Sequence, residues 1–245
     1  MTFTCSQASY SGKIQVYFTC PNGTTYYLYH PKIEQGNVVT RYIPNISESS
    51  FESNNIVYDS SGYNNNGSIT GNLIINNNTP KYNSSIYFNG SSYILTDNSS
   101  FAWFDFNQCT IAGWMKPTTT PSSYSGSFGI AHNSIDGYYA KCFSICNSNG
   151  NFKINAAKGS TWIFIDTGQN AIINEWHHYV AVLDGTTVKA YIDGILVYTT
   201  TIDWGTATTA SDTRVQIAVD LPGSDEIYQG YYSDIRIYTT ALTEE

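Results

Sequence analysis

The sequence predicts an all-β sandwich or jelly-roll over residues 56–245, preceded by a short β-rich segment. Runs of Tyr, Ile, Val and Thr recur at short intervals, and these residues favour strands. Asn and Gly, which favour turns, separate the runs. No apolar pattern with a period of 3.6 residues continues beyond two helical turns. Many short strands joined by turns are typical of a sandwich or jelly-roll.

Turn signals mark the ends of the expected strands. Asp193-Gly194 separates two apolar runs and is the strongest hairpin signal in the chain. Asn149-Gly150 marks another turn. The strands expected in the main domain are residues 56–58, 73–75, 84–88, 92–96, 109–116, 127–131, 141–147, 151–157, 161–166, 176–184, 187–193, 195–199, 214–219 and 231–238.

Residues 1–44 are expected to form a separate, β-rich anchoring segment. Residues 13–18 alternate polar and apolar side chains, as a half-buried strand does, and residues 25–29 form a second strand. So few strands bury little core, and the segment therefore needs a partner surface. It is interpreted as a full module, a remnant, or a piece completed by a neighbouring chain. The polar, Ser-rich residues 45–55 are expected to be a linker.

Composition excludes several functional classes. Charged residues make up 12% of the chain and aromatic residues 15%, which is not the composition of a disordered protein. The net charge of −8 argues against a nucleic-acid partner, since such partners require basic patches. No apolar run approaches the roughly 18 residues of a membrane span. The N-terminus also shows no signal-peptide pattern.

The five cysteines are spaced irregularly, which argues against a disulfide framework. Cys142 and Cys146 form a CxxxC pattern without a second half of a zinc site, so buried strand thiols are the preferred interpretation. A disulfide between Cys5 and Cys20 stays open.

Several segments, in order, resemble laminin-G-like domains of the concanavalin A-like superfamily. They are residues 59–67, 86–94, 109–117, 175–194 and 230–242. The resemblance implies a concanavalin A-like antiparallel jelly-roll sandwich over residues 56–245. Trp114 is expected in its core and Trp176 at a sandwich edge. A buried arginine needs a carboxylate, so Arg236 is expected to pair with Asp234 or with Asp59.

Residues 27–44 carry a second resemblance, to the ends of β-sandwich modules in bacteriophage tail and fibre proteins. It implies a virion-associated or extracellular location, other virion subunits as partners, and a homo-oligomer such as a trimer.

Catalysis is not expected. Retaining glucanases of this fold need two carboxylates about 5 Å apart. On a strand this requires acids at alternate positions, whereas Asp225 and Glu226 are adjacent and the other acids are scattered. No G-x-S-x-G nucleophile elbow is present. His177 and His178 should face opposite sides of one strand and so cannot form a metal pair.

A structural Ca²⁺ is the best chemical candidate, because this ion takes carboxylate, amide and carbonyl oxygens. Asp59 and Asn64 lie in one loop rich in such groups. The resemblance implies that Asp234 and Asp59 contribute as ligands. The alternative is an Asx-turn loop and an Asp–Arg pair without an ion.

Loop aromatics are the candidates for a glycan-binding site, since sugars stack on aromatic rings. Trp204 is the first of these, either as a stacking platform or as a loop anchor. The other candidates are Tyr124, Tyr138, Tyr139, Trp162 and Tyr228.

The leading hypothesis is a non-catalytic, virion-associated adhesion protein with a jelly-roll of glycan-binding type, acting on a cell-surface glycan. The alternatives are a purely structural assembly or decoration module, and last a polysaccharide hydrolase.

Overall fold

The computed structural model describes residues 55–76, 85–96, 101, 104–120, 127–131, 141–158, 161–220 and 226–244. All of them lie in one compact unit, Asn45–Glu245. The expectations for residues 1–44 and, apart from Asn55, for the linker lie outside the described residues. No helix in the described part is long and apolar enough to cross a membrane.

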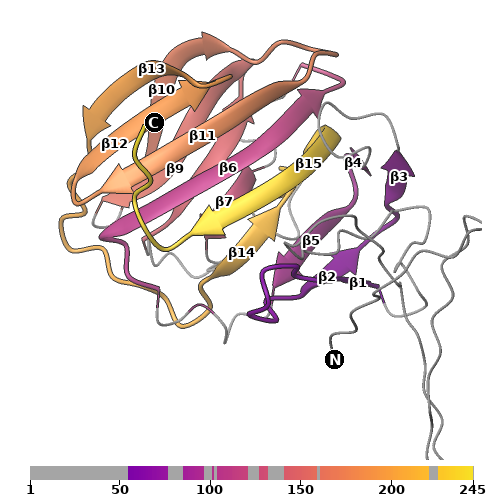
Figure 1. The fold of residues 1–245 in the computed structure, drawn as a ribbon, viewed down its shortest axis with the longest axis horizontal. Helices are drawn as coiled ribbons and strands as arrows, with labels where there is room; N and C mark the ends of the chain where they lie inside the picture. Colours follow the sequence, from indigo (N-terminus) through magenta and orange to yellow (C-terminus); the bar gives the residue numbers. More distant parts are fainter. Residues whose placement is uncertain are drawn as a thin grey trace, which may run out of the picture. The chain divides into compact units, whose positions relative to one another are not determined.

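Two antiparallel sheets form the described structure, as Figure 1 shows. In spatial order, the eight-stranded sheet A consists of β1 (Ile56–Val57), β2 (Gly67–Thr70), β5 (Tyr93–Thr96), β14 (Arg214–Ile217), β7 (Ser127–Ala131), β8 (Phe143–Ser148), β9 (Asn151–Lys158) and β10 (Thr161–Asn170). The seven-stranded sheet B consists of β13 (Ile195–Thr201), β12 (Thr187–Ile192), β11 (His177–Asp184), β6 (Gln108–Pro117), β15 (Gln229–Tyr238), β4 (Ser85–Asn89) and β3 (Ile74–Asn76). The predicted all-β sandwich is therefore confirmed.

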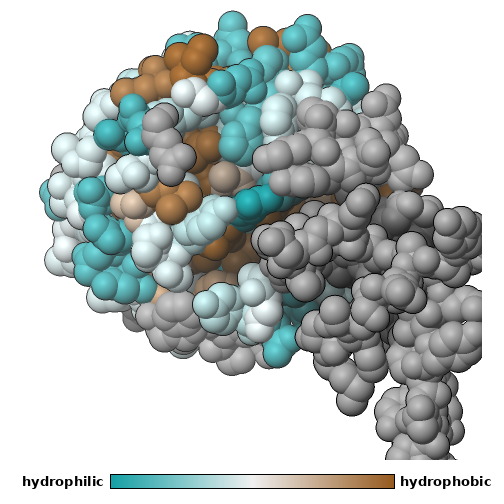
Figure 2. Space-filling model, viewed as in Figure 1, coloured by the Kyte–Doolittle hydropathy of each residue, from teal (hydrophilic) through white to brown (hydrophobic). Residues whose placement is uncertain are grey.

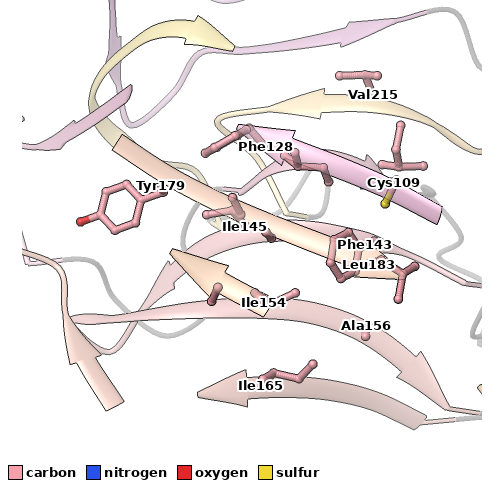
Figure 3. Close-up of a cluster of buried hydrophobic side chains, with 14 of the residues drawn as sticks. Cys109, Phe128, Phe143, Ile145, Ile154, Ala156, Ile165, Tyr179, Leu183 and Val215 are labelled. Atoms are coloured by element: carbon pink, nitrogen blue, oxygen red, sulfur yellow. The ribbon is translucent and has the colours of Figure 1, made fainter. Parts of the chain in front are cut away.

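The core lies between the two sheets, where alternate residues of facing strands meet. Figure 3 shows part of it, with Phe128 and Ile145 from sheet A and Cys109 and Tyr179 from sheet B. All four are at most 1% exposed. Since side chains alternate along a strand, the neighbours of these residues point to the outer faces of the sheets.

Trp114 is one of these neighbours, and its expected place in the core is wrong. In β6, Cys109, Ile111 and Met115 are fully buried in the core. Trp114 alternates with them and pairs with His178 of β11, whose ring centroid lies 5.2 Å away. The side chain is half-buried on the outer face of sheet B.

The strongest predicted hairpin is confirmed at Asp193-Gly194, which joins β12 to β13. Both residues have positive φ, at 51° and 81°, as a tight primed turn requires. The strand β2 was not predicted, whereas every strand predicted within residues 56–245 has a counterpart in the structure.

Candidate functional site

A row of polar side chains crosses the middle of sheet A on its outer face. The register places Gln216 of β14 opposite Gly129, Gly129 opposite Ser144 of β8, and Ser144 opposite Asn155 of β9. We call Gln216, Ser144 and Asn155 the polar row. Its members lie far apart in the sequence, and the strand order β14-β7-β8-β9 brings them together.

Gly129 fits between these side chains because it has none of its own. A Cβ atom added there would lie 2.6 Å from the Cα of Ser144 and 2.7 Å from the carbonyl oxygen of Phe143. Any larger residue would therefore force β7 and β8 apart.

Gln216 and Ser144 are buried, at 0% and 1% exposure, yet their side chains have no hydrogen-bond partners within the described part of the chain. Neither the amide nitrogen nor the amide oxygen of Gln216 is paired, and the Ser144 hydroxyl is also unpaired. An unpaired buried polar group costs about 1–3 kcal/mol, so native proteins rarely keep one without a water or a ligand.

Asn155 continues the row as part of a hydrogen-bonded group. Its amide nitrogen donates to Asp220 at 2.7 Å, and its amide oxygen accepts from the Cys146 thiol at 3.0 Å. Burial raises the pKa of the Cys146 thiol well above its usual range, and the Asp220 carboxylate raises it further. Cys142 and Cys109 are buried free thiols as well, as the sequence predicted for strand cysteines.

Aromatic side chains flank the polar row on the neighbouring edge strand, β10. Trp162 and Phe164 alternate with the core residue Ile165 and are half-buried. Phe164 lies opposite Asn155 in the strand register. Trp162 packs on a small patch formed by Ala131, Cys142, Ala157 and Ala207. Among the predicted glycan-binding residues that the structure describes, Trp162 lies on the same sheet face as the polar row.

Trp204 serves as a loop anchor, the alternative already weighed from the sequence. It packs against the core, with its ring centroid 5.7 Å from that of Phe106 in an edge-to-face contact. Lys141 Nζ lies 5.5 Å from the Trp204 ring centroid. The core contact and Lys141 therefore occupy part of the indole surface.

Tyr228 is not a stacking platform, and this prediction is wrong. The side chain is 1% exposed, and its ring centroid lies 4.5 Å from that of Tyr232 in the core. A loop aromatic before a long strand has turned inward to fill the sandwich. Tyr124, Tyr138 and Tyr139 lie outside the described residues.

Aromatic residues that the sequence did not single out as a site gather on the outer face of sheet B. They are Tyr87, Tyr231 and Trp176. Tyr87 and Tyr231 alternate with the core residues Phe88 and Tyr232 along their strands. This alternation is the sequence signal that indicates that the two tyrosines lie on the outer face of the sheet. Trp176, expected at a sandwich edge, lies directly before β11.

The adjacent histidines face opposite sides, as predicted. His178 contacts Trp114 on the outer face of sheet B. His177 Nδ1 lies 2.6 Å from Asp193 Oδ2 in the β12–β13 turn. This contact and a hydrogen bond from the His178 backbone N–H to Asp193 Oδ1, at 2.8 Å, hold the turn against β11.

Asp166, on the same face of sheet A as Lys153, lacks the properties of a general acid. Burial acts to raise its pKa, but hydrogen bonds from Gly168, Asn151 and Lys153 outweigh burial and lower it. A glycosidase acid needs a raised pKa in order to carry a proton at neutral pH. Asp166 instead stays ionised and pairs with Lys153 at 3.3 Å.

The residues predicted to bind Ca²⁺ hold other partners. Asp59 accepts hydrogen bonds from the Ser61 backbone N–H at 2.7 Å, the Ser61 hydroxyl at 2.5 Å and the Asn65 backbone N–H at 3.0 Å. Asp234 accepts from Arg236 Nε at 2.8 Å. Asn64 is exposed, with φ of 59°. Within the described part of the chain, no three or more His, Cys, Asp or Glu side chains gather as a metal site.

Because the Asp59 oxygens are already hydrogen-bonded within their loop, we expect chelation to leave stability unchanged. The melting temperature should agree within 1 °C in 1 mM Ca²⁺ and in 1 mM EDTA, where a bound structural ion would add roughly 3 kcal/mol at 100 times its dissociation constant. Differential scanning calorimetry measures this directly. A fall of several degrees in EDTA would instead support the predicted calcium ligands.

The whole arrangement matches a known family. A family model described as the concanavalin A-like lectin/glucanases superfamily matches residues 88–245. The chain belongs to this superfamily. The resemblance seen in the sequence motifs is thus confirmed, and the superfamily includes proteins that hold carbohydrate with and without cleaving it.

Solved structures share the fold of this superfamily member. Domain 4 of AbnA, an extracellular GH43 arabinanase from Geobacillus stearothermophilus, solved with arabinotriose, has a TM-score of 0.60 and 23% identity over 78% of this chain and 90% of that one. The receptor-binding domain of botulinum neurotoxin C/D mosaic serotype has a TM-score of 0.55 and 17% identity over 76% of this chain and 46% of that one. The binding domain of botulinum neurotoxin DC, in complex with SialylT, has a TM-score of 0.54 and 16% identity over 76% of this chain and 46% of that one. A comparison with curated proteins gave no match.

Proposed function

We propose that this protein is a non-catalytic carbohydrate-binding module whose polar row receives a glycan. The unpaired amide of Gln216 beside the unpaired hydroxyl of Ser144 carries the proposal. Sugar hydroxyls both donate and accept hydrogen bonds, and so do the amide and hydroxyl groups of these two side chains. In a site shielded from water, pairing such atoms adds more affinity than at an exposed position.

The neighbours of the row support the same ligand. Trp162 and Phe164 offer half-buried aromatic surface beside it, suited to the apolar faces of sugar rings. Asp220, which accepts a hydrogen bond from Asn155, extends the hydrogen-bonding groups of the row at its end opposite Gln216. Asp166, kept ionised, supports binding rather than hydrolysis.

Replacing Gln216 by leucine should abolish the binding of the protein to its glycan, while the protein stays folded. The change removes an unpaired buried amide, so the free energy of unfolding should stay equal or rise by about 1 kcal/mol, while affinity falls tenfold or more. Binding is first screened on an array of neutral arabinose, galactose, glucose, mannose and xylose oligosaccharides. The best polysaccharide is then cast into gels for affinity electrophoresis.

The matched control is Gln169→Leu, the same chemical change at an exposed position of β10. It should bind as the wild type does. Trp162→Ala should weaken retention as Gln216→Leu does. A Gln216→Leu protein that is destabilised but retained normally would mean that the amide serves folding through a bound water, and the proposal would fall.

The setting we propose is the outside of a bacteriophage particle, where the module acts as an adhesion protein for a cell-surface glycan. The phage-like pattern of residues 27–44 supports this, with residues 1–44 attaching a homo-oligomer, such as a trimer, to other virion subunits. Particle fractionation with an antibody against the full chain, together with light scattering, tests it. If the protein is recovered with the particles but binds no glycan on the array, a purely structural decoration module would be favoured.

A further inference from the structure

A second site is built on the other sheet, from a cross-strand row on the outer face of sheet B. Tyr87 of β4 lies opposite Tyr231 of β15, and Tyr231 lies opposite Lys116 of β6. Trp176 precedes the His177–Met115 pair by one residue and so lies beside Lys116. We call Tyr87, Tyr231, Lys116 and Trp176 the aromatic row. It spans three inter-strand steps of about 4.8 Å, or ~14 Å in all.

The rings of the aromatic row contact one another. The Tyr87 and Tyr231 centroids lie 4.8 Å apart with an interplanar angle of 46°, and the Trp176 and Tyr231 centroids lie 6.1 Å apart at 53°. The amide nitrogen of Gln229 donates to the Tyr87 hydroxyl at 3.3 Å, which fixes that ring. The row is therefore an ordered aromatic surface rather than a set of independent side chains.

These aromatics are not needed by the core. Phe88, Tyr232 and Met115 fill the inner side of the same three strands and are at most 2% exposed. The members of the aromatic row alternate with them and are half-buried on the outside. Figure 2 views this face, on which brown hydrophobic patches lie among pale and teal residues. Half-exposed aromatic rows with a polar surround are typical of binding surfaces.

Lys116 gives the row its charge. Its Nζ lies 5.9 Å from the Tyr231 ring centroid. In the described part of the chain, Lys153, Lys189 and Arg236 each pair with a carboxylate. Lys116, like Lys141 and Arg214, has no carboxylate partner among the described residues. A cation held among aromatic rings without an acidic partner suits a ligand that brings its own carboxylate.

We propose that the aromatic row binds a glycan chain that carries carboxylates. The sugar faces lie on Tyr231, Tyr87 and Trp176, and Lys116 pairs with a uronate-type carboxylate. The polar row lies on the other sheet and takes no part, so a module with both sites joins two glycan chains.

The net charge of −8 opposes an acidic ligand but does not decide its binding. The Debye length is about 8 Å at physiological ionic strength, so charges on distant surfaces are largely screened. The charge of Lys116 would be screened much less, because Lys116 would contact the ligand directly. Binding should therefore weaken only moderately as salt is raised, in contrast to the steep salt dependence of a polyanion held by many cations.

Affinity electrophoresis of the full chain through polygalacturonate, alginate and hyaluronate tests the proposal, with methyl-esterified polygalacturonate as the neutral counterpart. The wild type should be retarded by at least one of the three acidic chains. Methyl esterification, or the substitution Lys116→Met, should lower the affinity about tenfold or more. Lys116→Arg keeps the charge and should retain most of it, while Tyr231→Leu should lose it.

Tyr63→Leu is the matched aromatic control, since Tyr63 is 82% exposed and lies away from both rows. It should bind as the wild type does, and so should Gln216→Leu, because the polar row is on sheet A. Urea midpoints confirm that each variant is folded. No retardation by any of the three polyanions, equal retardation of Lys116→Met, or equal retardation by single-stranded DNA would overturn the proposal. The proposed function is tested separately, by asking whether Gln216→Leu loses the binding of neutral glycans.

Discussion

Replacing Phe128 by alanine should lower the free energy of unfolding by about 3–5 kcal/mol, a large part of the total for a domain of this kind. Phe128 is 0% exposed and joins the two sheets. Its ring lies 5.5 Å from Tyr232 of β15 in an edge-to-face contact, and a Cβ at Gly113 of β6 would come within 3.2 Å of it. Truncation leaves a cavity that strands packed this closely cannot close.

Equilibrium unfolding in urea, followed by tryptophan fluorescence, measures the effect. Phe128→Leu fills most of the volume and should cost about 1 kcal/mol. Tyr63→Ala, at an exposed position, should change the stability by less than about 0.5 kcal/mol. A loss below 1 kcal/mol for Phe128→Ala would mean that the contact between β7 and β15 is not a main support of the sandwich.

The same packing explains why the sequence predicts the fold well. Strands such as β7, expected at 127–131 and found at Ser127–Ala131, combine an apolar period of two with turn residues at each end. β2 was missed because Gly67–Thr70 is short, contains a single apolar residue, Ile69, and follows a loop rich in Asn. Its strand geometry comes from pairing with β5, a contact that local sequence does not encode.

The polar row could not be predicted from spacing, because its geometry depends on a crossover. Ser144 and Gln216 are 72 residues apart in the sequence, and only the strand order β14-β7-β8 of sheet A brings them together. For Trp114, by contrast, the sequence held a usable signal. Lys116 lies two residues further along β6 and therefore on the same face, and a lysine rarely points into a core.

Tyr228 shows the limit for single aromatic residues in loops. An exposed platform and an inward anchor have the same local sequence, and the choice depends on the space between the sheets. Here that space lies beside Tyr232 and is filled by the Tyr228 ring. For Tyr87 and Tyr231, by contrast, period-2 alternation with the core residues Phe88 and Tyr232 already indicates the outer face of the sheet.

Raising the pH from 10 to 12 should unfold the domain, because tyrosines in the core must stay protonated. Burial, together with the smaller effect of the Asp193 carboxylate, raises the pKa of Tyr179 from 10.0 to about 12. Burial also raises the pKa of Tyr228 and Tyr232 well above 10.0. A group with a raised folded-state pKa contributes stability that is complete below its unfolded pKa and is lost as the pH rises toward its folded pKa.

The expected loss is large because the effects of the three groups add. For Tyr179 alone, a rise of about two pKa units corresponds to roughly 3 kcal/mol lost between pH 10 and pH 12. Absorbance at 295 nm follows tyrosine ionisation, and far-ultraviolet circular dichroism follows the fold. Buried tyrosines should ionise only together with loss of the β signal, whereas in urea all should titrate near pH 10.

Tyr179→Phe supplies the control, since it keeps the ring that packs 4.9 Å from Phe152 and removes the titrating hydroxyl. Its alkaline unfolding midpoint should lie at higher pH than that of the wild type, with stability at pH 7 changed far less. If all tyrosines of the native protein ionise near pH 10 while the β signal is intact, the core hydroxyls are open to water. The tyrosine packing between the two sheets would then be looser than the ring contacts of Tyr179, Tyr228 and Tyr232 indicate.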